Sequence, residues 1–471
     1  MDWKRAAFAL IVALTMVGTV WFAYHFASQP GLNDYIGDEV WYVPASRNVL
    51  HLLGVNVTYE FNGTYGVNVI FANESDKFKY LSTADAIAAF SGVRLRIEYY
   101  NFPGVYYEIP KEEYRDFLEK LSTQLPDGSY YIVPGFRYPD KENIQNYLNT
   151  EHPFLGKDFI MLSMVLLGDR PISWRLPGII EFALIELLVV LAAYRISKSY
   201  LASLIALAFV VADPTLQATS VAAMLDIHVA FFVALFVLAL AYEMELGSSI
   251  SLGLAGATKL SGAFGWPVLL WRALKREKSF VRFFSIVVVI PGIVFLLPEL
   301  PIIKAIGFIP WLREFLGSFR WHLSYKGPNP NTSPFWQWFV NYRAFPFHFN
   351  PNVFASTDPV LLLGMVVLIF AMPWLHRRKP GILAPFMVFW STIGLFALQY
   401  VLGGKTQFSF YATVLVPPAS VVMGVALNEL LRWEAFRSSL DFYWEKLKGF
   451  KDWAFQKLGS EKSISSESPQ D

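Results

Sequence analysis

The sequence contains no cysteine and carries little charge for its length. The absence of cysteine excludes disulfide bonds, thiol catalysis and metal sites built from thiolates. Only 16% of the 471 residues are charged, whereas a soluble globular domain has about 25% charged residues. A formal net charge of +1 provides no overall field that would attract nucleic acid. These deficits argue against a large soluble protein and favour a chain that crosses a membrane many times.

Long apolar runs and many aromatic residues stand in place of the missing charge. Hydrophobic residues make up 54% of the chain, which includes 15 Trp, 23 Tyr and 41 Phe, and aromatic residues are enriched at membrane interfaces. A transmembrane helix needs about 20 predominantly apolar residues. By this measure the predicted spans are 6–27, 173–194, 201–219, 227–242, 283–298, 359–375, 382–402 and 407–427.

The first run, residues 6–27, follows Lys4 and Arg5 and could pass for a secretory signal. It is longer than the roughly 7–15 apolar residues of a signal peptide, and aromatic residues stand where small ones would precede cleavage. We therefore expect a retained membrane helix. Clusters of Lys and Arg mark cytoplasmic ends of spans, and they occur at residues 4–5, 195–198, 272–282 and 377–379.

The segment 243–282 does not fit simple spans. Both of its ends are expected on the cytoplasmic side, yet only about 22 residues separate 243–249 from the basic cluster that begins at Arg272. Two full spans need about 40 residues. We expect a hairpin of two short helices that turns near "GATKLSG" (256–262), because broken helices occur at membrane depth where they line a cavity. With the hairpin counted as two, about ten helices result, and both termini lie inside.

Two regions, 28–170 and 299–358, are then expected outside the cytoplasm. Within the first, "VRLRIEYY" and "SYYIVP" alternate like strands, whereas "KEEYRDFLEKL" has helical spacing, so residues 55–148 predict a small α/β module. The predicted domains are 1–54, a first transmembrane helix with a catalytic outer loop; 55–148, the module; 149–431, the membrane core; and 432–471, a cytoplasmic segment.

The cytoplasmic segment has two parts. In 432–458, apolar residues recur every three to five positions with Lys and Arg between them. This pattern predicts an amphipathic helix that lies on the inner leaflet. The remaining "SEKSISSESPQD" has the composition of a disordered tail.

Charged and polar residues gather at the predicted outer ends of the spans. A charge at the centre of a membrane helix costs ~2.5–3.5 kcal/mol or more, so such residues usually pair and face a cavity. Both signs at one face therefore predict a polar chamber. Simpler interpretations exist: Asp158, Asp169 and Arg170 as solvated loop charges, and Asp226 and Lys259 as residues at helix ends. The full set is Asp38, Glu39, His152, Lys157, Asp158, Asp169, Arg170, Arg175, Asp213, Asp226, Lys259 and Lys405.

Five sequence blocks, in order, resemble one family. "GDEVWY" holds the adjacent acids Asp38 and Glu39; "HPFLGKDFIMLSMVLLGDRPISWRLPG" resembles an H-P-P-L-G-K block that continues to W-R-L-P; "AMLDIHVAFF" resembles an M-L-D segment; "GLAGATKLSG" resembles a G-x-A-x-x-x-K-W-S-G turn; and "SPFWQWF" resembles S-P-W-W-x-W. Together they resemble the protein O-mannosyltransferases that use dolichyl-phosphate mannose. That resemblance implies the GT-C fold of polytopic α-helical membrane glycosyltransferases.

The chain departs from this family at several places. Phe154 replaces the second Pro of H-P-P, Leu260 replaces the Trp of K-W-S-G, and Lys405 stands where many members have Arg. The region 299–358 is too short for a β-trefoil MIR domain, as in the short prokaryotic and archaeal form. The module 55–148 has no counterpart that we identify in the family.

The resemblance implies transfer of mannose from a polyprenyl (dolichyl) phosphate donor to Ser/Thr hydroxyls of proteins at the extracytoplasmic face. Such a transfer needs a base near the acceptor oxygen and positive charge where the phosphate leaves. Asp38 is the candidate base, with Glu39 as its orienting neighbour, paired with Arg175. The phosphate would bind Lys405, His152, Lys157 or Arg175, and Asp226 and Lys259 would shape the chamber.

Several alternatives stay open at this point. Asp38, Glu39, Asp213 and Asp226 could hold a divalent ion through oxygen ligands, although the resemblance implies no obligatory metal or other cofactor. The same fold could move another lipid-linked sugar to a lipid or glycan acceptor. A transporter is disfavoured because no internal repeat is evident, and a mere membrane anchor does not need ten helices. The sequence leaves the sugar, the acceptor and the oligomeric state undetermined. Tyr35, Trp41 and Tyr42 read best as anchors at the membrane interface.

Overall fold

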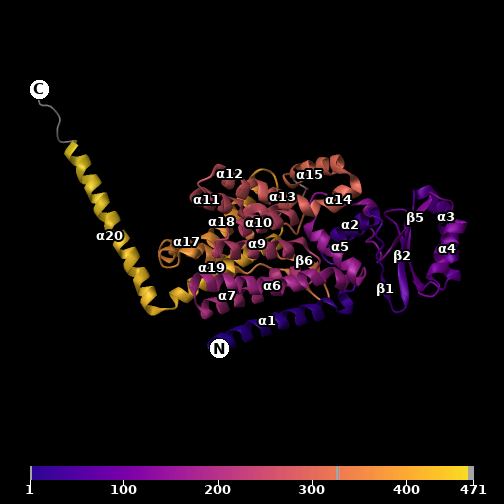
Figure 1. The fold of residues 1–471 in the computed structure, drawn as a ribbon, viewed down its shortest axis with the longest axis horizontal. Helices are drawn as coiled ribbons and strands as arrows, with labels where there is room; N and C mark the ends of the chain where they lie inside the picture. The colour runs from indigo at the N-terminus through magenta and orange to yellow at the C-terminus, as the bar shows by residue number, and fades with distance from the viewer. Residues whose placement is uncertain (1–2, 325–326, 328, 465–471) are drawn as a thin grey trace, which may run out of the picture.

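The computed structural model describes residues 3–324, 327 and 329–464, and it consists of a long helical bundle with a small β-sheet module at one end (Figure 1). Helix α1 begins and helix α20 leaves the bundle at the opposite end from the module. The helices before the core are α1 (Trp3–Ala27), α2 (Glu39–Leu52), α3 (Glu74–Phe90), α4 (Tyr114–Gln124) and α5 (Leu155–Leu167).

The helices from α6 onward follow in the chain. They are α6 (Pro171–Ser197), α7 (Tyr200–Ala212), α8 (Pro214–Ser220), α9 (Leu225–Ala241), α10 (Glu245–Thr258), α11 (Trp266–Arg276), α12 (Phe280–Phe284), α13 (Ile290–Leu296), α14 (Leu300–Ile306), α15 (Phe308–His322), α16 (Phe335–Trp338), α17 (Pro359–Arg378), α18 (Leu383–Val401), α19 (Val416–Leu430) and α20 (Trp433–Ile464). Short helical turns are η1 (Pro30–Leu32), η2 (Ile144–Asn146), η3 (Leu260–Gly265), η4 (Ser285–Val289), η5 (Leu297–Glu299), η6 (Pro380–Ile382) and η7 (Ser409–Leu415).

The chain is a multi-pass membrane protein. Within the described residues, six helices are long and apolar enough to cross a membrane, and the bent pair α7–α8 makes a seventh. Helix α9 is apolar but shorter. The spans are Trp3–Ala27, Pro171–Ser197, Phe280–Ile306, Pro359–Arg378, Pro380–Val401 and Ser409–Leu430. The polytopic helical class is thus confirmed, while length and composition do not reproduce the count of ten.

Two of the predicted helical segments are broken. The span predicted at 201–219 bends by 58° between α7 and α8, because Asp213 caps the new helix through the Leu216 N–H (2.9 Å) and Pro214 follows it. The predicted hairpin consists of α10 and α11 with η3 between them. Its turn requires glycine at 262, where a Cβ atom would lie 2.1 Å from the carbonyl oxygen of Ala255.

The module is an antiparallel five-stranded sheet with two helices on one face. The strands lie in the order β1-β2-β4-β3, with β5 also paired to β2. Side chains alternate along each strand, so Val67, Val69 and Val105 pack beneath α3 and α4. The strands are β1 (Glu60–Phe61), β2 (Thr64–Phe71), β3 (Leu95–Tyr99), β4 (Gly104–Pro110) and β5 (Tyr130–Pro134), and a separate hairpin in the membrane part is formed by β6 (Phe345–His348) and β7 (Val353–Ala355).

A buried ion pair joins the module to the bundle. Arg47 on α2 donates through Nε to Oδ2 of Asp169 at 2.6 Å, and both side chains are almost completely buried. Asp169 also accepts from the N–H of Phe136, just after β5, and from Nε1 of Trp174. Gly135 allows this approach, since a Cβ there would lie 2.3 Å from Asp169 Oδ2. The interpretation of Asp169 as a solvated loop charge is therefore wrong.

The helices at the two ends of the chain differ slightly from the predicted ones. Helix α20 continues to Ile464, into the stretch expected to be disordered, and the rest of that stretch, 465–471, lies outside the described residues. The predicted start of the first span at residue 6 lies inside α1, which begins at Trp3.

We predict that Asp169→Ala strongly destabilises the full chain, because it leaves the Arg47 charge buried without a partner. Loss of one member of a buried ion pair costs about 3–5 kcal/mol, so the midpoint of heat unfolding in detergent should fall by several degrees. The matched control is Asp116→Ala, which removes an exposed partner of Lys120 and should cost at most about 1 kcal/mol. Equal midpoints for both variants would contradict the assignment.

Candidate active site

The loop between α1 and α2 is fixed by Glu39. This residue begins α2, is completely buried, and forms a two-point ion pair with Arg175 of α6, at 2.7 Å (Nε to Oε1) and 2.8 Å (Nη2 to Oε2). Its oxygens also accept from the N–H groups of Ile36 and Ala223. The expected pairing of Glu39 with Arg175 is present, and it ties the loop to two other parts of the bundle.

Arg175 has no donor left for a phosphate. Its remaining N–H groups donate to the backbone carbonyls of Ala27, Leu32 and Asp34, at 3.2, 2.7 and 2.6 Å. An arginine has five N–H donors, and with the two bonds to Glu39 all five are used. Arg175 therefore organises the loop from inside, and the geometry does not support the phosphate-binding role expected from the sequence.

Asp38, next to Glu39, remains available for chemistry. Its side chain is partly exposed, and the hydroxyl of Tyr42 lies 3.4 Å from Oδ2. Burial raises the pKa of Asp38 to about 6, although the nearby charge of Lys259 lowers it and that of Asp226 raises it. A carboxylate with such a pKa is ionised at neutral pH and can take up a proton.

Lys259 and Asp226 form a second charged pair beside Asp38. Lys259 lies at the turn between α10 and η3, and its Nζ is 3.0 and 3.1 Å from the two carboxylate oxygens of Asp226, at the start of α9. Nζ also lies 4.0 Å from the centre of the Tyr411 ring. Both partners are nearly buried. The hairpin turn therefore brings a cation close to the loop that carries Asp38.

An apolar cavity of about 490 Å³ begins at Lys259. His322 and Tyr411 line it beside the lysine, and the remaining lining is mostly apolar side chains of η3, α13, α15 and α18, among them Phe264, Phe295, Phe315, Phe319, Leu395 and Leu398. The cavity thus joins one cationic end to an apolar body. That combination fits a lipid phosphate whose chain extends away from the charge.

The other expected phosphate ligands differ in availability. Lys157 is completely buried, and its ammonium donates to the carbonyls of Asn149 (2.5 Å) and His152 (2.8 Å) and to Oδ1 of Asn149 (3.2 Å). All three of its donors are used. Lys405 is exposed in the loop after α18. Its neighbour Gly404 packs so tightly that a Cβ there would lie 2.6 Å from the carbonyl oxygen of His322, so this loop borders the cavity.

His152 lies near the cavity but is not a cation at neutral pH. Burial lowers the pKa of His152 well below its usual value, and the nearby His322, Lys259 and Lys157 lower it further. Its ring centre is 5.1 Å from that of His322 and 6.0 Å from that of Tyr42. Nδ1 is buried without a hydrogen-bond partner among the described residues. A neutral His152 can donate or accept one hydrogen bond there.

Two residues of this site, Tyr411 and His322, were not expected from the sequence. Tyr42 was expected as an anchor at the membrane interface, and the structure shows it buried with its hydroxyl next to Asp38. The sequence offers one signal for Tyr411, which directly follows "GGKTQFSF", the segment that contains Lys405. Among the residues that the structure describes, no group of three or more His, Asp or Glu side chains could hold a metal ion. Of the four acids considered for a metal, Glu39, Asp213 and Asp226 are engaged elsewhere.

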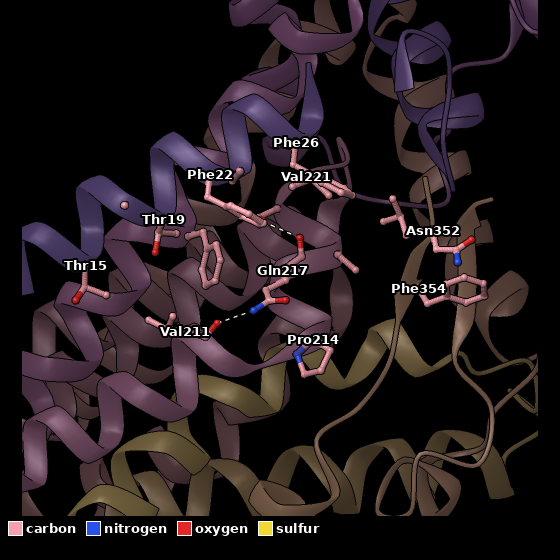
Figure 2. Close-up of a pocket in the computed structure, with 16 residues that line it drawn as sticks. Thr15, Thr19, Phe22, Phe26, Val211, Pro214, Gln217, Val221, Asn352 and Phe354 are labelled. Carbon is pink, nitrogen blue, oxygen red and sulfur yellow. Dashed lines mark hydrogen bonds between the residues drawn. The ribbon is translucent and has the colours of Figure 1, made fainter. Parts of the chain in front are cut away.

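A second cavity, of about 530 Å³, lies on the α1 side of the bundle (Figure 2). It is bounded by Thr15, Thr19 and Phe22 of α1, by Gln217 of α8 and by the segment that contains Phe354. None of the described residues that line it is charged. It therefore lacks the groups needed for acid–base chemistry, and the reacting centre is better placed at Asp38.

Comparisons with known proteins agree with this architecture. No family model matches the chain. Proteins from two strains of Mycolicibacterium smegmatis, both named polyprenol-phosphate-mannose–protein mannosyltransferase, are 27% identical over 197 residues, which is 34% of this chain and 38% of theirs. The chain thus matches well under half of these relatives. These matches confirm the resemblance to the protein mannosyltransferases that the motifs indicate.

The fold also matches a solved structure. The crystal structure of ArnT from Cupriavidus metallidurans bound to undecaprenyl phosphate superposes with a TM-score of 0.51 at 13% identity, over 94% of this chain and 63% of ArnT. At this identity the likeness concerns the fold alone. It confirms the expected GT-C architecture of membrane glycosyltransferases.

The Lys259–Asp226 pair yields a prediction about stability. Lys259→Met and Asp226→Asn should each lower the midpoint of heat unfolding, because each leaves one charge nearly buried without its partner. The double variant should lose less than the sum of the single losses, with a coupling of about 0.5–3 kcal/mol. Strictly additive losses in a double-mutant cycle would contradict a direct interaction.

Proposed function

We propose that this chain transfers mannose from a polyprenyl-phosphate donor to Ser/Thr hydroxyls of proteins, with inversion, at the extracytoplasmic membrane surface. The observation that supports this most is the position of Asp38. It is a partly exposed carboxylate with a pKa of about 6, beside the cation Lys259 at the end of an apolar cavity. The GT-C fold and the names of the curated relatives agree with it.

The donor would enter with its chain in the apolar cavity and its phosphate near Lys259. The ammonium of Lys259 is held by Asp226 through two oxygens, and a lysine has three N–H donors, so one remains for a phosphate oxygen. Lys405 would approach from the adjoining loop, and His152 would add a neutral hydrogen bond. These residues replace Arg175 and Lys157, whose donors are all used inside the protein.

The reaction would be a single displacement. The acceptor oxygen forms a bond to the anomeric carbon on the face opposite the phosphate, and its proton passes to a carboxylate oxygen of Asp38. The bond between the anomeric carbon and the phosphate oxygen breaks, and its electron pair leaves with the phosphate, whose charge Lys259 stabilises. Glu39 and Arg175 hold the loop, so that Asp38 need not reorganise during the step.

A second candidate function keeps the reaction but changes the acceptor. The uncharged cavity beside α1 opens among spans that face the bilayer, since only 11% of the α1 span is buried. The β6–β7 hairpin beside it contacts the loop through the bond from the Gly37 N–H to the Phe347 carbonyl. In this alternative the enzyme would transfer another lipid-linked sugar, and a lipid or glycan acceptor would reach the site through this cavity.

Asp38→Asn tests the base directly. With the full chain in liposomes, a polyprenyl-phosphate mannose donor and a Ser/Thr peptide, we expect turnover to fall by about 10²–10⁴-fold, because the amide cannot accept the proton. Asp34→Asn is the control, since Asp34 lies in the same loop but its carboxylate is paired with Arg137, and it should retain activity. Near wild-type turnover of Asp38→Asn would overturn the proposal. Mass spectrometry of products from cell membranes would distinguish protein from lipid acceptors.

The pKa of Asp38 predicts an acid limb in the pH profile. Because its pKa is raised from 3.8 to about 6, the base form is present above that pH and is lost as the pH falls through it. We expect kcat/KM to drop below pH ~6. Lys259→Met should move this limb to higher pH, because the lysine charge lowers the pKa of Asp38. A profile that stays flat down to pH 4.5 would contradict this role.

A further inference from the structure

Helix α20 lies at the end of the bundle away from the candidate active site. It follows α19, whose span begins near Tyr411 of the site and ends at Leu430. Figure 1 shows α20 (yellow) leaving the bundle at a steep angle to the spans and extending beyond them. Most of its length therefore has no protein surface against it in the described part of the chain.

One face of α20 is apolar and open. At about 100° per residue, a sector about 120° wide contains Trp433, Phe436, Leu440, Tyr443, Trp444, Leu447 and Phe450. The exposed fractions are 55% for Leu440, 61% for Leu447 and 64% for Phe450. Side chains of this size at such exposure mark an interaction surface.

The charges of α20 are sorted by sign around the helix. Between Trp433 and Lys457, all four acidic residues fall within a sector of about 40°, on the side away from the apolar face. Four of the five basic residues instead flank the apolar sector on both sides, and the fifth, Lys451, lies inside it near one edge. The acids are Glu434, Asp441, Glu445 and Asp452, and the bases are Arg437, Lys446, Lys448, Lys451 and Lys457.

Two side chains of α20 contact the membrane-spanning helix α17. The hydroxyl of Tyr443 donates to the backbone carbonyl of Phe370, and the guanidinium of Arg377 lies 4.7 Å from the ring centre of Phe442. Phe370 lies eight residues before the end of α17 at Arg378, which is about 12 Å inside the end of that span. The contact therefore places Tyr443 of the apolar face beside this part of the α17 span.

We propose that α20 lies in the plane of the membrane surface opposite the Asp38 loop and binds phospholipids there, with its basic flanks on lipid phosphates. Lysine and arginine can bury their stems along acyl chains while the charges reach the head groups. The acidic sector then faces water. The alternative partner for an apolar stripe with three- and four-residue spacing is the same helix of a second copy of the chain. The sorted charges and the engagement of Tyr443 favour the lipid surface.

The absence of cysteine makes the test direct, since single cysteines can be introduced without background. Nitroxide labels would be placed at L440C, L447C and F450C on the apolar face and at D441C, E445C and D452C on the acidic sector, in the full chain in nanodiscs of phosphatidylcholine and phosphatidylglycerol. We expect labels on the apolar face to be accessible to oxygen and shielded from a water-soluble nickel complex. The acidic-sector labels should show the reverse.

Two outcomes would overturn the proposal. Equal access of nickel to both sets of labels would place α20 in water, and spin–spin broadening between copies at L447C would indicate a dimer. A charge variant adds an independent measurement. K446E, K448E and K451E combined should raise nickel access at L447C more in anionic nanodiscs than in pure phosphatidylcholine, whereas E434Q, on the acidic sector, should not change it. No change in nickel access with the triple variant would equally contradict the role of the basic flanks.

Discussion

The two-point bond between Glu39 and Arg175 is the interaction on which the candidate site depends. It connects a loop that has just left the first span to α6, and Arg175 also holds three backbone carbonyls of that loop. Asp38 is covalently next to Glu39, so its position follows from this bond. Loss of either partner of a fully buried charge pair strongly destabilises a protein, so we expect changes at Glu39 or Arg175 to disturb the position of Asp38 as well.

The burial of charge separates residues that build the site from residues that can act in it. Arg47, Lys157 and Arg175 are among the largest completely buried side chains, and each is used by partners within the protein. Asp38 and Lys405 are more exposed. Lys259 lies between these groups, because it is nearly buried and paired but also lines a cavity. A cation of this kind can meet a ligand without first leaving its partner.

Part of this arrangement could be predicted from the sequence. Asp38 and Glu39 stand out because two acids follow a span directly, and the helical period of α20 is visible because its apolar spacing is regular. The saturation of Arg175 and Lys157 could not be predicted, since their acceptors are backbone carbonyls whose directions depend on loop conformation. The Arg47–Asp169 pair was also hidden, because its burial arises from the packing of the sheet module. The bend at Asp213 depends on a local cap within an otherwise continuous apolar run.

The link between Glu39 and Arg175 has a consequence for how the protein is made. The partners are 136 residues apart in the chain, and the whole sheet module is synthesised between them. At typical translation rates of about 5–20 residues per second, Glu39 waits on the order of ten seconds for its arginine. The first span is therefore synthesised well before its following loop can be completed, and the module is made while that carboxylate still lacks its partner. The loop can reach its final form only after α6 has been made.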